Sequence, residues 1–371
     1  MAKEKTFYQI LKEKEELKKL REERESEWYN LRPILGHANW AIFYFLIGGR
    51  EAGKSYAVTN FFVDQFINKG IPFYWFRLTD TQAGKLLKNN AEKLVDPDLR
   101  RKYDLDLVTK GDNVYNVTKR SKPDKDGKTK VLEKKFMARV MALSTFYNDK
   151  GSIFDKDFLK DPKMRYNVAI DEFQREKNEK RTFDILYGLT NQLENNFRSI
   201  KERIKIFFMG NTLEECSEIL SSFNFLPQEF GIFKLKNKRA LIHYIEPSKK
   251  YLERRKGTIA DLLMPTASTF TNKIDTDTSL IYDGKLGKPQ YIIKFSKDKK
   301  DWFTLWDKGV ICPYNSERKP VIAMRMYIDE IFNLDAMNQV VALFNTRSYK
   351  FKNSITFVRF QSQLELLKPS R

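Results

Sequence analysis

The feature that most constrains this chain is a glycine-rich octapeptide that directly follows an unbroken apolar run, residues 40–47. An apolar run of this length before a glycine loop predicts a buried strand. After the octapeptide, apolar residues recur at helical spacing, which predicts a helix from Lys54 to about Asn68. The octapeptide is Gly48-Gly49-Arg50-Glu51-Ala52-Gly53-Lys54-Ser55, and the apolar residues of the helix are Tyr56, Val58, Phe61, Phe62 and Phe66.

The octapeptide matches GxxxxGK[S/T], the phosphate-binding loop or Walker A motif, in the strand–loop–helix context that this motif requires. Without Cβ atoms, glycine N–H groups can curl around a phosphate chain, and the helix N-terminus adds positive potential. We therefore assign residues 48–56 to nucleotide binding, with Lys54 on the β- and γ-phosphates of ATP and Ser55 on Mg²⁺. The alternative is a glycine turn with a chance lysine.

A second motif lies more than 110 residues downstream, where a short apolar strand, Val168-Ala169-Ile170, ends in Asp171-Glu172. This pattern is typical of the Walker B half of a P-loop ATPase, in which Asp171 binds Mg²⁺ and Glu172 orients or deprotonates the attacking water. The alternative is a strand that merely ends in acidic residues.

A third apolar strand, Ile204 to Met209, ends in Gly210-Asn211-Thr212. A polar residue at the tip of such a strand can sense the γ-phosphate and pass that state to other parts of the molecule. Asn211 is the candidate sensor, and an Asx-turn without a catalytic part is the alternative.

The net charge of +19 favours a polyanionic partner. Residues 119–135 carry eight Lys or Arg against three Asp or Glu, and residues 234–256 carry nine against two, so the two segments supply 12 of the excess charges. Such concentration suits a nucleic-acid backbone, although a solvated loop or linker is the alternative. The turn at 123–128 lies between two apolar segments and predicts a hairpin with a basic tip. Its candidate DNA-binding residues are Lys119, Arg120, Lys122, Lys125, Lys128 and Lys130.

Cysteine and histidine are too scarce for several classes of site. The two cysteines, Cys216 and Cys312, indicate neither a disulfide framework nor a zinc site, and two histidines, His37 and His243, make a histidine metal centre unfavourable. The charged N-terminus lacks a secretory signal, and the longest apolar run is too short for a membrane span. We expect a protein of the cytoplasm that is not secreted and has no membrane partner.

Four regions are expected along the chain. Residues 1–33 contain a charged helix over 6–28 with a narrow apolar stripe, which packs on the main domain or on a neighbouring subunit. Residues 34–230 form an α/β domain with a mainly parallel sheet, including strands at 72–78 and 204–209 and a long, partly irregular insertion at 79–165. Residues 231–257 are predicted to be a basic linker, and 258–371 a second unit. Its strands are expected at 279–283, 290–296 and 302–306, and its helices at 327–345 and the C-terminus.

Together these motifs resemble the DNA-packaging ATPases of phi29-type tailed bacteriophages. The resemblance rests on the P-loop, on Asp171-Glu172-Phe173 with Arg175-Glu176-Lys177, and on Asn196-Phe197-Arg198 with Glu202-Arg203 before Asn211. It spans roughly residues 40–212. It implies an additional-strand, catalytic-glutamate (ASCE) P-loop ATPase and an RNase H-like, vestigial nuclease as the C-terminal α+β domain.

The resemblance also implies partners and roles. The family works as a homo-oligomeric ring, usually a pentamer, on the capsid portal and drives double-stranded DNA into the prohead. Arg198 falls on the arginine that the family inserts into the neighbouring subunit's ATP site, but one extra residue before Glu202 leaves Lys201 and Arg203 as alternatives. Arg50 corresponds to the P-loop arginine of terminases, which acts in cis. The sequence leaves open whether a structural RNA mediates attachment to the portal.

Two other functions compete with the motor. A terminase with an active two-metal nuclease needs clustered carboxylates, and the second half offers only scattered ones. A small-molecule P-loop kinase explains neither the charge nor the Asp-Glu pair nor the second domain. The scattered carboxylates are Asp261, Asp275, Asp277, Asp283, Asp301 and Asp307.

Overall fold

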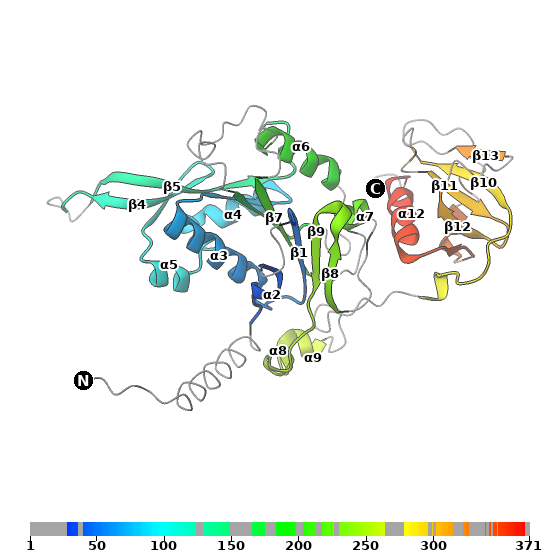
Figure 1. Ribbon diagram of the computed structural model, residues 1–371, viewed down its shortest axis with the longest axis horizontal. Coiled ribbons are helices and arrows are strands. Elements are labelled where there is room, and N and C mark those ends of the chain that lie inside the picture. Colours follow the sequence, from blue (N-terminus) through cyan, green and yellow to red (C-terminus); the bar gives the residue numbers. More distant parts are fainter. Residues whose placement is uncertain are drawn as a thin grey trace. The chain divides into compact units, whose positions relative to one another are not determined.

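The computed structural model describes the chain with gaps and divides it into two units (Figure 1). The first unit comprises Met1–Leu213 and Pro227–Lys273, and the second comprises Glu214–Leu226 and Ile274–Arg371. The described residues are 28–35, 40–123, 129–148, 165–174, 183–197, 203–211, 217–223, 225, 230–263, 278–295, 299, 302–314, 322–325, 338, 341–342, 344–346 and 348–367. The predicted helices at 6–28 and 327–345 fall largely outside them. Among the described helices, none combines the length and apolarity that a membrane span needs.

The first unit is built on a nine-stranded sheet of order β3-β4-β5-β2-β6-β7-β1-β9-β8. Strands β5, β2, β6, β7, β1 and β9 run parallel to one another, whereas β3, β4 and β8 are antiparallel additions at the two edges. The strands are β1 (Phe43–Ile47), β2 (Phe73–Arg77), β3 (Leu107–Lys110), β4 (Asn113–Arg120), β5 (Val131–Ala142), β6 (Tyr166–Asp171), β7 (Ile204–Gly210), β8 (Gly231–Leu235) and β9 (Ala240–Tyr244).

Strand β7 lies between β1, which leads into the P-loop, and β6, which ends in Asp171. The predicted α/β class with a mainly parallel sheet is therefore confirmed for the first unit, and the inserted β7 gives the strand order expected of an ASCE fold. Because all three strands are parallel, their carboxyl ends lie at one edge of the sheet, where open α/β sheets bind ligands.

Helices cover both faces of this sheet. One face packs against α3, α4 and α5, and the other against α6, whose Phe197 contacts Tyr74 and Tyr166. Register neighbours on β1 and β7 stack their rings, Tyr44 on Phe207 at 4.8 Å between centroids. These cross-strand aromatic pairs fix the register that aligns the two strand ends. The helices are α2 (Arg32–Leu35), α3 (Lys54–Lys69), α4 (Asp80–Ala91), α5 (Pro97–Tyr103), α6 (Ile185–Phe197), α8 (Lys249–Arg255) and α9 (Ile259–Leu263).

Two predicted regions of the first unit differ in the structure. The described part of the insertion at 79–165 is largely regular. It contains α4 and α5, its strands β3–β5 extend the sheet, and β4 and β5 form the predicted hairpin (Figure 1). The segment predicted as a basic linker, 231–257, instead forms β8, a 3₁₀ turn (Lys236–Lys238), β9 and α8. The prediction was wrong because a run of lysines is typical of a linker, whereas an edge strand and a turn can also carry such charge.

The second unit is a five-stranded sheet of order β13-β10-β11-β12-β14 with α12 packed on one face. Strands β10, β11 and β12 form an antiparallel meander, and β13 runs parallel to β10. The predicted strand at 279–283 is instead a 3₁₀ turn (Thr278–Leu280) with one bridge at Ile281, and α7 belongs to this unit rather than to the first. The elements are α7 (Glu218–Ser222), β10 (Pro289–Lys294), β11 (Trp302–Trp306), β12 (Val310–Pro313), β13 (Ile322–Arg325), β14 (Lys350–Phe351) and α12 (Ser354–Leu367).

Candidate functional site

The P-loop connects β1 to α3 as the motif predicts. Its last glycine, Gly53, precedes α3 with φ at 89°, in the left-handed region that a residue with a Cβ rarely adopts. A Cβ there would also lie 3.1 Å from the ring of Trp28. Glycine at this position therefore lets the loop turn sharply into the helix N-terminus, where free N–H groups favour an anion.

Lys54 is the buried cation of the site. Its Nζ donates to the carbonyl oxygens of Gly48 and Gly49, each at 2.7 Å, and the residue is only 7% exposed. Burial lowers the pKa of Lys54 to about 8, and the nearby carboxylates of Asp171 and Glu172 oppose that effect. An anion bound in the P-loop beside Lys54 would raise the lysine's pKa again, because it favours the charged ammonium.

The two Walker B carboxylates lie beside this lysine, as predicted. Asp171 ends β6 and is 8% exposed, and Glu172 follows it with φ at 55°. The hydroxyl of Ser55 lies 3.3 Å from Oδ1 of Asp171, across the intervening strand β7. A hydroxyl and a carboxylate are hard oxygen donors that suit Mg²⁺, so the residues present fit this metal.

Arg77, the last residue of β2, joins both carboxylates and was missed by the sequence analysis. Its two terminal nitrogens donate to Asp171 Oδ2 and Glu172 Oε2, each at 2.6 Å. The Arg77 side chain is 15% exposed, so its pair with Asp171 is largely shielded from water, whereas the Glu172 side chain is 39% exposed. The available signal was a single charged residue that closes the otherwise apolar strand Phe73-Tyr74-Trp75-Phe76.

The end of β7 brings Asn211 to the same edge of the sheet. Gly210 allows this close approach, since a Cβ there would lie 2.6 Å from the ring of Phe173. The Asn211 carbonyl accepts a hydrogen bond from Gln174 Nε2 at 3.4 Å. Asn211 therefore occupies the strand tip between the P-loop strand and the Walker B strand, the position from which a sensor role was predicted.

The remaining P-loop residues face outward. Arg50 and Glu51 are exposed, and Tyr56 is 45% exposed on α3 rather than part of its apolar face. The hydroxyl of Tyr251 donates to the Arg50 carbonyl at 2.8 Å, and Arg255 pairs with the Glu51 carboxylate. Helix α8 thus holds the outer side of the loop.

The structure places only part of the other predicted site residues. Arg198, Lys201, Lys125 and Lys128 lie outside the described residues. Arg203 precedes β7, at the opposite end of that strand from Asn211. Arg203 therefore lies far from the P-loop of its own chain.

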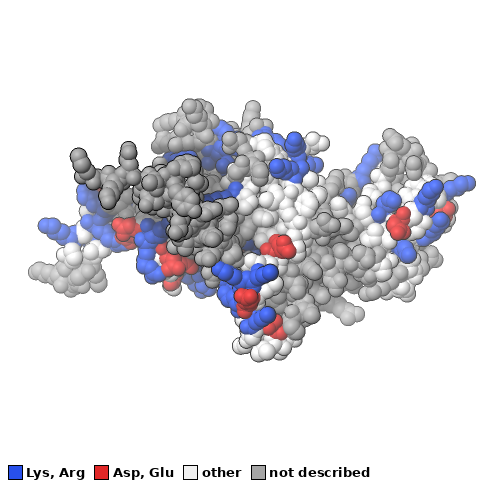
Figure 2. All heavy atoms as spheres, turned by 60° about the horizontal axis from the view of Figure 1, so that its bottom comes forward, with Lys and Arg blue, Asp and Glu red and all other residues white. Residues whose placement is uncertain are grey.

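Of the DNA-binding candidates on the hairpin that the structure describes, two are exposed and two lie beside acidic residues. Lys122 and Lys130 are exposed, whereas Lys119 lies 3.5 Å from Glu133 and Arg120 pairs with Asp106. The hydrogen bonds from Arg120 lower the pKa of the Asp106 carboxyl, burial opposes them, and the charge of Arg120 lowers it further. Figure 2 shows basic atoms around this end of the sheet, interspersed with acidic ones.

No protein-family model matches the chain, but comparison with single proteins finds relatives. The DNA packaging proteins of Bacillus phage phi29 and Bacillus phage PZA are each 24% identical to it over 287 residues, which is 77% of this chain and 74% of each relative. Among solved structures, the bacteriophage Phi-29 viral genome packaging motor assembly superimposes with a TM-score of 0.59 at 19% identity, covering 92% of this chain and 100% of that chain.

The Phi-28 gp11 DNA packaging motor also has a TM-score of 0.59, at 14% identity over 93% of this chain and 99% of that chain. At such identities the structural likeness shows the fold. The sequence relatives are DNA packaging proteins, which is the family that the P-loop and Walker B motifs resembled. In sequence and in fold, this chain is similar to the DNA packaging proteins of phi29-type bacteriophages.

Proposed function

We propose that this protein is an ATPase that drives double-stranded DNA into a preformed viral capsid. The observation that carries the proposal is the convergence of Lys54, Ser55, Asp171 and Glu172 at one edge of an ASCE sheet. The similarity to phage DNA packaging proteins over about three quarters of the chain selects packaging among the many functions of this fold.

In the proposed reaction each residue has a distinct part. The P-loop amides and Lys54 bind the phosphates of ATP and stabilise charge on the transferring phosphoryl group. Ser55 and Asp171 would hold Mg²⁺, which neutralises phosphate charge when bound. Glu172 accepts a proton from the attacking water, and Asn211 reports the γ-phosphate to the rest of the sheet.

We further propose that the subunits form a ring, a pentamer by the resemblance, that docks on the portal of the prohead in the host cytoplasm. Arg198 of one subunit would reach the neighbour's ATP site, with Lys201 and Arg203 as the alternatives, while Arg50 would act in cis. A guanidinium suits this task because it stays charged and binds phosphate oxygens in a forked geometry. A structural RNA as an additional component stays open.

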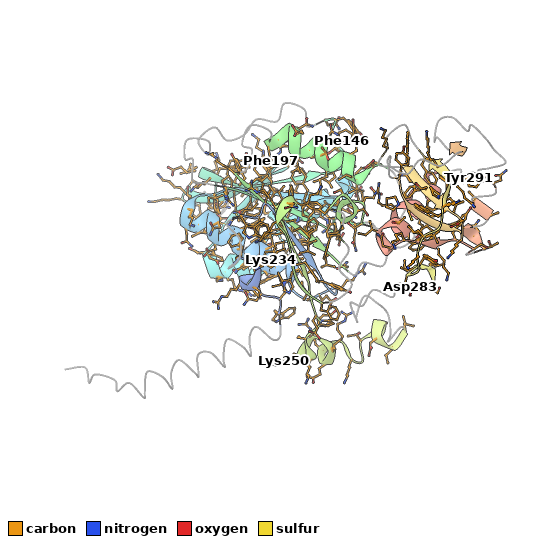
Figure 3. The ribbon with its side chains drawn as sticks, turned by 45° about the vertical axis from the view of Figure 1, so that its right-hand side comes forward. Phe146, Phe197, Lys234, Lys250, Asp283 and Tyr291 are labelled. Carbon is orange, nitrogen blue, oxygen red and sulfur yellow. The ribbon has the colours of Figure 1, made fainter. Side chains whose placement is uncertain are left out.

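For the second unit we propose an RNase H-like domain that does not cut DNA. A three-strand antiparallel meander followed by a strand parallel to its first strand supports this assignment. Two-metal cleavage requires carboxylates around a metal pair, yet β10 and β13 carry none, and the described residues contain no cluster of three metal ligands. One of the scattered carboxylates of this unit, Asp283, is labelled in Figure 3. Nicking of plasmid DNA by the purified protein with Mn²⁺ would overturn this assignment.

The central experiment measures ATP hydrolysis with and without double-stranded DNA as salt is raised. We expect DNA to stimulate hydrolysis, and the stimulation to fall steeply with ionic strength because backbone binding releases counterions. Phosphate transfer to a metabolite without any effect of DNA would instead favour a small-molecule kinase.

A further inference from the structure

Helix α9 exposes an apolar face. Ile259, Leu262 and Leu263 are 80%, 75% and 77% exposed, the largest values among the described large hydrophobic residues. Their spacing of i, i+3 and i+4 places them on one side of the helix. Single exposed aliphatic residues are ordinary, but three that share a helix face indicate a surface that another segment covers.

This face is linked to the P-loop through the preceding helix α8. Arg255 pairs with the Glu51 carboxylate, and Arg254 donates to the Glu51 carbonyl at 2.8 Å. Lys250 on the same helix is labelled in Figure 3. Whatever binds along α8 and α9 therefore also contacts the helix that supports the outer side of the phosphate loop.

The N-terminal region joins the fold at this place. The guanidinium of Arg254 lies 3.8 Å from the ring centroid of Trp28, a cation–π contact, and the Tyr29 amide donates to the Ala52 carbonyl at 2.9 Å. The 27 residues before Trp28 thus enter the first unit beside α8.

The sequence of those residues complements the surface. Residues 22–27 contain four glutamates and one arginine, while 249–256 contain five basic residues and one glutamate. Leu17 and Leu20 lie on the apolar stripe before this acidic stretch. Leu20 lies eight residues before Trp28, and Leu262 lies eight residues after Arg254, so each is at most about 29 Å from the Trp28–Arg254 contact even along a fully extended chain.

We propose that residues 6–27 dock in cis on α8 and α9, with the acidic stretch along α8 and the leucines on the α9 face. Trp28 already lies against Gly53, where a Cβ would come within 3.1 Å of its ring, so the docked segment would brace the P-loop from outside. This inference does not rest on the reaction that the site performs.

Hydrogen–deuterium exchange of the full-length protein tests the docking without any turnover. We expect the amides of residues 6–27 to be protected, and Leu262→Asp to reduce that protection at least tenfold, since burial of a leucine is worth about 1.5–3 kcal/mol. Leu262→Met should retain protection. Leu132→Asp is the matched control, because Leu132 is also exposed, at 56%, but lies on the hairpin strand β5.

Two results would overturn the proposal. The first is exchange of residues 6–27 at free-peptide rates in the wild type, or protection that Leu262→Asp leaves unchanged. The second comes from lysine cross-linking of mixed ¹⁴N- and ¹⁵N-labelled protein. Cross-links between Lys19 and Lys256 should join only chains of like mass, and mixed masses would assign the occupant to a second copy.

Discussion

Glu172 is the residue to which the proposed chemistry is most sensitive. Glu172→Gln keeps the size and a hydrogen-bonding oxygen near Arg77 but removes the proton acceptor. We expect ATP binding to persist and kcat to fall by about 10²–10⁴, the usual contribution of a general base. Rates of phosphate release and nucleotide binding measure this, with the exposed Glu194→Gln on α6 as a control. Retained turnover would remove Glu172 from the mechanism.

Arg77 supports both carboxylates, so its loss should affect stability as well as chemistry. Arg77→Ala leaves the buried Asp171 without its ion-pair partner, and we expect the free energy of unfolding to fall by about 1–3 kcal/mol. Arg77→Lys should recover only part of the lost unfolding free energy, because an ammonium does not bridge two carboxylates as the planar guanidinium does. Urea denaturation of both variants measures the effect. Arg101→Ala, which breaks an exposed pair with Asp98, should change stability by less than about 1 kcal/mol.

Lys54 predicts a pH dependence of nucleotide binding. Since burial lowers its pKa to about 8, part of the lysine is neutral in mildly alkaline solution, and phosphate binding requires the charged form. ATP affinity should therefore fall as pH rises through about 8, and binding above that pH should take up protons. Calorimetry in buffers of different ionisation enthalpy measures the uptake. Lys54→Met should bind weakly with no uptake from this group, and equal uptake in the variant would contradict the assignment.

At the scale of elements, the hairpin of β4 and β5 is the candidate DNA-binding element. Replacing Lys122, Lys125 and Lys130 by glutamine should weaken DNA binding for all sequences alike. It should also reduce the slope of log affinity against log salt by about 0.9 for each phosphate that the variant no longer neutralises. Fluorescence anisotropy at several salt concentrations measures both. An equal loss of charge on α4, through Lys85, Lys88 and nearby Lys93, is the control, and an unchanged slope would make the hairpin an ordinary surface element.

The elements around the P-loop were predictable because local chemistry defines them. The glycines require a loop, and the apolar spacing after Lys54 requires a helix. Strands β8 and β9 were missed for an equally physical reason. The segment resembles a linker because it carries Lys234, Lys236 and Lys238. These lysines lie on the edge strand β8 and the turn after it, where charge is tolerated. Strand β9, by contrast, is short and mainly buried.

Across the whole molecule, the contacts that could not be predicted are those that depend on the order of strands in the sheet. Arg77 reaches Asp171 because β2 pairs with β6, a neighbour separated by about 90 residues in the chain. No local pattern encodes that pairing. Asp171 and Ser55 were predictable partners because the P-loop and Walker B motifs imply a shared site, whereas Arg77 belongs to neither motif.

The sheet also bears on cooperation between subunits. Phe197 ends α6 and packs on Tyr166, the first residue of β6, while the P-loop lies at the carboxyl end of the sheet. A strand of six residues spans about 20 Å, so Phe197 lies about one strand length from the edge of the sheet that carries the P-loop. We therefore propose that Arg198 serves the ATP site of another subunit.

This geometry predicts complementation in mixed rings. Arg198→Ala rings and Lys54→Ala rings should each hydrolyse little ATP, because one lacks the donated arginine and the other the phosphate-binding lysine. Mixing them places an intact P-loop of the first variant beside an intact arginine of the second, so hydrolysis should recover in proportion to such interfaces. Mixing Arg198→Ala subunits with Lys54→Ala/Arg198→Ala subunits is the control and should recover nothing. If the test mixture also stays inactive, Arg203 and Lys201 become the variants to examine for the role in trans.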